Sequence, residues 1–367
     1  MTASPQRLAD HHSRSSHQAA TAAESAPRIA DWNTPANMAG RDLAIDTMRG
    51  IAILMVIGIH ALAQPLGPRE IWIDAVLRPC VPIFLFASGY LSARSGRVPL
   101  AKRLTTALIP YAIAFVAAYV YMALHNPAMD HRVTTTLARF GLGYVFVYYY
   151  VFIYVGCSLA LWLVFRLRGI NAPQSGRRLT TALLFSIMFG LLVGSYLDPL
   201  LLHLGFSQSL VEEVRMRNIP FWFCFVALGV LVARFGTGSV LRDMRWPIAA
   251  GALLTYAVYA SVRRFGIGDA ADYDSVAFLA YAGTLCLLLH ALDLRSPWLA
   301  ALGSGSYFIY LWHIFLVMVL RDHGALRQLG VVTDTAVTFA LAALGSIVAL
   351  MLIRRLAPPR VVRWLGA

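Results

Sequence analysis

The stretch LAIDTMRGIAILMVIGIHALA, residues 43–63, decides the fold and points to the chemistry. It is apolar enough to enter a bilayer, and its only ionisable residues are Asp46, Arg49 and His60. Charged groups at membrane depth are costly, so they usually face a protein interior and mark function. Eleven residues at about 100° each return to within about 20° of the starting direction. Arg49 and His60 are therefore expected on one helix face, about 16 Å apart along the axis, with Asp46 beside Arg49.

The composition of the whole chain agrees with this first segment. The 367 residues are 59% hydrophobic and 13% charged, whereas a soluble domain carries about 25% charged residues. Runs long enough to cross a bilayer recur along the chain. The sequence therefore predicts an all-α polytopic membrane protein with about ten transmembrane helices. The expected spans are 43–63, 76–93, 104–124, 142–165, 179–197, 218–234, 247–263, 275–292, 299–320 and 333–356.

The net charge of +13 fits a membrane protein better than a nucleic-acid partner. Its arginines are spread along short loops and form no soluble basic domain. When the N-terminus is placed in the cytosol, Lys and Arg favour the cytosolic side by about two to one. Both termini are therefore predicted to be cytosolic, and the bilayer is the expected partner.

Three zones follow from composition. Residues 1–40 are rich in Ala, Ser and His and hold almost no large aliphatic residues, so they are predicted to be a disordered cytosolic tail. Residues 41–356 form the predicted transmembrane domain, and 357–367 a cytosolic C-terminal tail. The four cysteines form no CxxC pair and are expected to be small buried apolar residues, with no metal site.

Further polar residues are candidates for a site. Lys102 and Arg103 lie at the start of the third span, where two cations could hold the phosphate of a cytosolic ligand. Topology alone also makes such loops basic. In the ninth span, Ser306, Tyr310 and His313 fall on one helical stripe. A histidine in that stripe favours an interior polar surface over an aromatic belt.

Two further groups of side chains are less specific. The fourth span opens with a tyrosine run that includes Tyr149, and one or two of these rings are expected to line a pocket while the others belong to the belt or the packing. Glu212 and Glu213, together with Arg215 and Arg217, are expected to form an exposed loop of mixed charge before the sixth span.

Four motifs resemble the acyltransferase-3 family of integral-membrane acyltransferases. IDTMRGIAILMVIGIHA, residues 45–61, is similar to the family's first span, which has an Arg-Gly pair and a histidine eleven positions after the arginine. The other three motifs are VPIFLFASGYL (81–91), KRLTTALIPY (102–111) and GSYFIYLWH (305–313). The resemblance covers roughly residues 42–356. Where the family usually has a second arginine, three residues after Arg103, this chain has Thr106, and a tyrosine run replaces a tryptophan that is frequent in the fourth span.

The resemblance implies transfer of an acyl group, commonly acetyl, from cytosolic acyl-CoA to a hydroxyl of a glycan or lipid-linked oligosaccharide at the bacterial inner membrane. His60 is then the general base, because histidine suits proton transfer near neutral pH. Arg49 holds a CoA phosphate or the thioester oxygen, and Asp46 orients Arg49 or offsets its charge. The expected path of CoA runs from phosphates at the cytosolic end to a thioester beside His60, within one ligand-accessible cavity that Arg49 and His60 share. Lys102 and Arg103 are assigned to donor binding, and the substrate-binding candidates are Tyr149, Ser306, Tyr310 and His313.

Other interpretations stay open at this point. Asp46, Arg49 and His60 on one stripe would also suit a proton-coupled transporter or flippase, although no inverted repeat is evident. In a purely structural interpretation, Asp46 and Arg49 are an interfacial pair and His60 is a polar residue between helices. Acetyl and succinyl transfer are not distinguished, nor is direct transfer from an acyl-enzyme relay.

Overall fold

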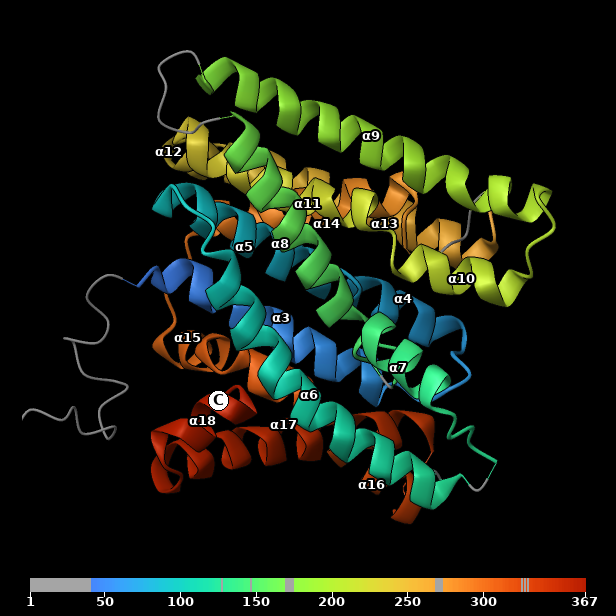
Figure 1. Ribbon diagram of the computed structural model, residues 1–367. Helices are drawn as coiled ribbons and strands as arrows, with labels where there is room; N and C mark the ends of the chain where they lie inside the picture. Colours follow the sequence, from blue (N-terminus) through green and yellow to red (C-terminus); the bar gives the residue numbers. More distant parts are fainter. Residues whose placement is uncertain are drawn as a thin grey trace, which may run out of the picture. The chain divides into compact units, whose positions relative to one another are not determined.

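The computed structural model describes most of the chain as helices joined by short connections (Figure 1). The described residues are 41–126, 128–145, 147–168, 175–267, 273–324, 326, 328 and 330–367. The predicted tail, residues 1–40, lies outside them. By their contacts, Asp42–Ala367 form one unit, and all regular structure described in that unit is α-helical or a single helical turn, as the all-α prediction requires.

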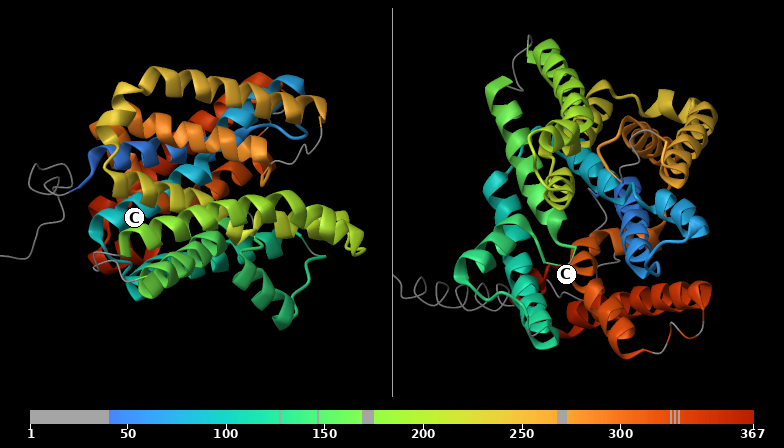
Figure 2. Two further views of the ribbon diagram at one scale, coloured as in Figure 1. Left: turned by 90° about the horizontal axis from the view of Figure 1, so that it is seen from above. Right: turned by 90° about the vertical axis from the view of Figure 1, so that its right-hand side faces the viewer.

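The described helices are α3 (Leu43–Ala61), α4 (Pro68–Leu77), α5 (Cys80–Ser95), α6 (Leu100–His125), α7 (Val133–Leu142), α8 (Tyr149–Arg168), α9 (Ser175–His203), α10 (Gln208–Met216), α11 (Ile219–Phe235), α12 (Gly238–Asp243), α13 (Arg245–Phe265), α14 (Val276–Leu292), α15 (Pro297–Ser304), α16 (Ser306–His323), α17 (Val331–Leu356) and α18 (Pro359–Leu365). The longer ones run side by side, as two turned views show (Figure 2).

Seven helical segments in the described part are long and apolar enough to cross a membrane, and the bent pair α15–α16 makes an eighth candidate. Helix α14 is apolar but shorter. A helix lies at each of the ten expected spans, but the number ten and the cytosolic position of the termini stay predictions. The fourth span was predicted too early, because α8 begins at Tyr149, after a turn that closes α7.

The ninth expected span, 299–320, was wrong as a single helix. It is broken at Gly305, with α15 and α16 at 77° to each other. The Gly-Ser-Gly-Ser run at 303–306 has low helix propensity, and kinks concentrate at such pairs. The chain also passes close to α17 here, since a Cβ on Gly305 would overlap the Leu350 side chain. The break places the first turn of α16 where it can face α3.

Helix α3 is held tightly against α15 by two glycines. A Cβ on Gly50 would overlap the Leu299 carbonyl, and a Cβ on Gly303 would overlap the Asp46 carbonyl. Small residues allow such close approach between membrane helices. The Thr47 hydroxyl also accepts the Ser296 backbone N–H at 3.2 Å. The turns of α3 that carry Asp46 and Arg49 are therefore fixed from one side by α15.

Both ends of α3 are also held by hydrogen bonds that involve side chains. At the start, the Asp42 carboxylate caps the Ile45 N–H at 3.3 Å and accepts a hydrogen bond from Arg94 at 2.7 Å. At the end, Arg321 of α16 donates to the carbonyls of His60 and Leu62, at 2.8 and 2.6 Å. A cation is favourable where a helix leaves carbonyls unpaired.

Helices α9 and α11 differ in their surroundings. In the segment Gln208–Phe235, which contains α11, 67% of the apolar window is buried inside the protein, against 22% in the segment Arg177–His203 of α9. Figure 1 shows α9 along one edge of the bundle, beside α11. The helices that carry the candidate site residues are α3, α6, α8 and α16.

Candidate functional site

Two ionisable side chains of α3, those of Arg49 and His60, line two different cavities, and Asp46 lines neither. We call the first the Arg49 pocket; it has a volume of about 400 Å³ and lies near the start of α3. The second, the His60 pocket, has a volume of about 610 Å³ and lies near the end of α3. The predicted residues that line the Arg49 pocket are Arg49, Lys102, Arg103, Ser306 and Tyr310. Those that line the His60 pocket are His60, Tyr149 and Tyr310.

The Arg49 guanidinium bridges two helices. Its Nη1 lies 3.2 Å from Asp46 Oδ1, and its Nη2 donates to Ser306 Oγ at 3.1 Å. The predicted shared face of Asp46 and Arg49 is thus confirmed. Ser306 is the first residue of α16, so the break at Gly305 is what brings it to Arg49. The fork of a guanidinium satisfies both partners at once, which a single ammonium cannot do.

Two serines of the neighbouring helix α5 hold the Arg103 side chain in place. Its Nη2 donates to Ser92 Oγ at 2.6 Å, and its Nη1 to Ser88 Oγ at 3.4 Å. With Arg49 and the exposed Lys102, it gives the Arg49 pocket three cations, while no carboxylate is among the described residues that line it. Such a set favours an anionic ligand, and phosphate in particular.

The His60 pocket has a different lining, in which charges of both signs meet. Asp74 is 1% exposed and accepts hydrogen bonds from Arg78 Nε at 2.8 Å and Arg263 Nη1 at 2.5 Å. Arg78 also lies over the Tyr273 ring, 5.0 Å from its centroid. Glu212 lines the same cavity. A buried carboxylate is tolerable only with such a full set of partners.

The prediction of an exposed loop of mixed charge before the sixth span is wrong. Its residues belong largely to α10, and Arg215 lines the His60 pocket, where it pairs with Asp198 and, at 3.7 Å, with Asp274. The physical reason is that Arg215 comes four residues after Val211, which is fully buried. Residues four apart share a helix face, so burial of one turns the other inward.

His313 lies next to His60 but is not among the residues that line either cavity. The two imidazole rings have centroids 5.4 Å apart and are tilted by 39°. His313 is fully buried, and its Nδ1 lies 2.9 Å from both the Ile309 and the Tyr310 carbonyl oxygens. This histidine, interpreted as substrate-binding from the sequence, therefore lies beside His60 and outside both cavities.

Tyr150 and Tyr310 line both cavities. Their rings meet edge-on, with centroids 5.3 Å apart, and the Tyr310 hydroxyl donates to the Val147 carbonyl at 2.5 Å. The sequence led us to expect one cavity shared by Arg49 and His60. The structure instead has two adjacent cavities with a common tyrosine wall. A ligand that reaches from Arg49 to His60 must pass these rings.

Several lining residues were missed by sequence reasoning. Asp74 and Arg78 stand four apart, a spacing that could have predicted their pairing. Arg321 gives no such signal, because its partners are carbonyls about 260 positions earlier. Tyr307, whose hydroxyl donates to the Ala107 carbonyl at 2.6 Å, also lines the Arg49 pocket.

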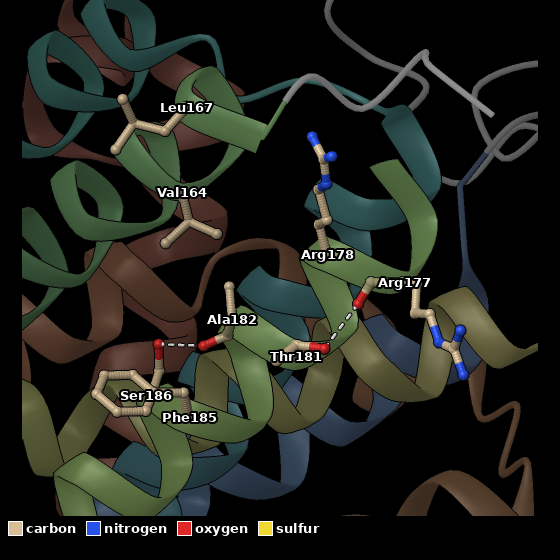
Figure 3. Close-up of a pocket in the computed structure, with 8 residues that line it drawn as sticks. All are labelled: Val164, Leu167, Arg177, Arg178, Thr181, Ala182, Phe185 and Ser186. Atoms are coloured by element: carbon tan, nitrogen blue, oxygen red, sulfur yellow. Dashed lines mark hydrogen bonds between the residues drawn. The ribbon is translucent and has the colours of Figure 1, made fainter. Parts of the chain in front are cut away.

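A further cavity of about 720 Å³ lies between α8 and α9, away from these groups (Figure 3). Its walls include Val164, Leu167 and Phe185, and Arg177 and Arg178 are its charged residues. Leu167 and Phe185 are 71% and 70% exposed. No imidazole, carboxylate or thiol is among the described residues that line it, so these side chains offer no group for acid–base chemistry.

One cysteine, Cys80, is among the residues that line the His60 pocket. All four cysteines are buried and free, as predicted. Among the described residues, no group of three or more His, Cys, Asp or Glu side chains is placed to hold a metal ion.

Comparison with known proteins gives one match. A family model described as an acyltransferase domain matches residues 42–355. A search of curated proteins and a search of solved structures found no match. The matched range contains α3 to α16 and most of α17, and with them every residue that lines the two pockets.

Proposed function

Since the chain belongs to the acyltransferase-3 family and has apolar helices that can cross a membrane, we propose that this multi-pass membrane acyltransferase moves an acetyl group from acetyl-CoA to a hydroxyl of a glycan or lipid-linked oligosaccharide. The observation that carries the proposal is the pair of cavities with the common wall of Tyr150 and Tyr310. One cavity suits an anionic donor, and the other holds a base.

The donor belongs in the Arg49 pocket. Coenzyme A carries three phosphate groups, and Lys102 and Arg103 offer cations where the pocket meets α6. Arg49 and His60 are separated by about 16 Å along α3. Arg49 therefore holds the phosphate or pantetheine part of the donor, and the thioester reaches past the tyrosines to His60. Asp46 and Ser306 keep the Arg49 guanidinium in the orientation that the donor needs.

The acceptor belongs in the His60 pocket. The cavity of about 610 Å³ has room for a sugar, and its rings and charged side chains provide both stacking surface and hydrogen-bond partners. His60 takes the proton of the acceptor hydroxyl while its oxygen attacks the thioester carbonyl. The new C–O bond forms, the C–S bond breaks, and the CoA thiolate receives the proton from His60.

A transporter or flippase is the second candidate. Two cavities near opposite ends of α3 with a common wall would also suit a pathway through the protein, with Asp46, Arg49 and His60 along it. The family match favours the enzyme, since it covers the helices that build both cavities.

The test is transfer of radiolabelled acetyl from acetyl-CoA to a glycan acceptor by the purified protein in detergent. We expect transfer by the wild type, none by His60→Ala, and normal transfer by the control His203→Ala, since His203 is exposed at the end of α9. Wild-type protein that transfers no acyl group but moves glycans or protons across liposomes would contradict the proposal. Localisation in the bacterial inner membrane is checked by membrane fractionation.

A further inference from the structure

The protonation pattern of His313 follows from its neighbours. Its Nδ1 lies 2.9 Å from two backbone carbonyl oxygens, those of Ile309 and Tyr310. A carbonyl only accepts, so Nδ1 must carry the hydrogen, and the lone pair of a neutral His313 is on Nε2. This Nε2 is buried and has no hydrogen-bond partner in the described part of the chain. Buried acceptors are seldom left in this state, and such an exception calls for an explanation.

The Tyr310 ring lies 6.5 Å from His313 by ring centroids, but its hydroxyl donates to the Val147 carbonyl. The nearer polar ring is that of His60. The ring centroids are 5.4 Å apart, and two imidazoles joined by an N–H···N bond of about 2.9 Å have centroids about 5 Å apart. The pair is therefore close to hydrogen-bonding distance without making the bond. His60, in turn, makes no side-chain hydrogen bond to a described residue. A hydrogen bond from a His60 ring N–H to His313 Nε2 would satisfy both groups.

The usual partner of a catalytic imidazole is a carboxylate that fixes its tautomer. Two carboxylates line the His60 pocket, Asp74 and Glu212. Asp74 is held by Arg78 and Arg263, and neither carboxylate is hydrogen-bonded to His60 in the described structure. The acceptor atom of His313 is therefore the available group that can fix the orientation of His60.

We propose that His313 is the positioning residue for His60, whose ring N–H it accepts on Nε2. This inference rests on the proposed function, in which His60 is the base. The bond holds the other His60 nitrogen toward the acceptor hydroxyl as a proton acceptor. When that nitrogen takes the hydroxyl proton, the imidazolium keeps its bond to His313. The proton then passes to the CoA thiolate, and His313 ends the cycle in the protonation state in which it began.

The test compares two substitutions of His313. In His313→Leu the acceptor is lost, and we expect kcat to fall about 10- to 100-fold, as for other groups that orient a reacting ligand, with KM for donor and acceptor within twofold of wild type. His313→Gln keeps a donor for the carbonyls of α16 and an acceptor for His60. We expect it to restore kcat to within a few-fold of wild type. His290→Gln is the matched control, because His290 also has a buried nitrogen without a hydrogen-bond partner among the described residues but lies beside Tyr90, outside both pockets.

A double substitution separates positioning from a purely structural role. His313→Leu should not slow the residual rate of His60→Ala any further, because the two residues act as one unit. Equal loss in both backgrounds, or His313→Leu with wild-type kcat, would overturn the inference while leaving the proposed function intact. Absence of transfer by the wild type would overturn the proposed function and this inference with it. Monodisperse elution and unchanged thermal unfolding of His313→Gln provide the control for folding.

Discussion

Replacing Arg49 by lysine keeps the positive charge but removes the planar, forked geometry of the guanidinium. The guanidinium contacts Asp46 at 3.2 Å and Ser306 at 3.1 Å through different nitrogens, and its side chain is 28% exposed. The single ammonium of lysine, on a flexible four-carbon stem, cannot hold both partners and also present a donor to the Arg49 pocket. One charge-assisted hydrogen bond to the donor is then lost, which costs about 1.5–3 kcal/mol.

That loss corresponds to an affinity for acetyl-CoA that is about 10- to 150-fold weaker. The assay is equilibrium binding of radiolabelled acetyl-CoA to detergent-purified protein, at one fixed salt concentration because charge contacts are screened. Arg97→Lys is the matched control, since Arg97 is exposed and does not line the Arg49 pocket. The affinity for CoA without an acyl group should fall by the same factor if Arg49 holds the phosphate or pantetheine part. Wild-type donor affinity in Arg49→Lys would refute this reasoning.

Three further perturbations test other parts of the structure. His60→Ala should abolish acyl transfer while donor binding stays within twofold of wild type; normal turnover would reject His60 as the base. Gly303→Ala should lower the free energy of unfolding by about 1–3 kcal/mol, because the new Cβ meets the Asp46 carbonyl; an unchanged melting curve in detergent would show that α3 and α15 are less tightly packed. Asp74→Asn should destabilise the protein by about 3–5 kcal/mol, since it removes the buried charge that pairs with Arg78 and Arg263, and a melting temperature equal to that of wild type would contradict that pairing.

Helical periodicity was enough to predict which side chains of α3 share a face. Asp46 and Arg49 are three residues apart on one turn, so their contact follows from the sequence alone. The stripe of Ser306, Tyr310 and His313 also lies on one helix, α16, as predicted. These successes concern residues that are close in the chain, where the geometry of a single helix sets which side chains meet.

Contacts between distant segments could not be predicted from the sequence. Ser306 reaches Arg49 across 257 positions, and it does so because the chain bends at Gly305. Arg215 looked solvent-exposed because its acidic partners Asp198 and Asp274 come from other segments. Periodicity placed Arg49 and His60 on one face, but it could not show that tyrosines from α8 and α16 divide the space in front of that face.

The central claim is that one ligand reaches from the cations of the Arg49 pocket to His60, past Tyr150 and Tyr310. The most direct measurement is a structure of the protein bound to a non-reactive thioether analogue of acetyl-CoA. The phosphates should lie at Lys102 and Arg103, and the sulfur between the tyrosines and within reach of His60. Phosphates bound in the His60 pocket, or a sulfur that stays on the Arg49 side of a closed tyrosine wall, would contradict the account.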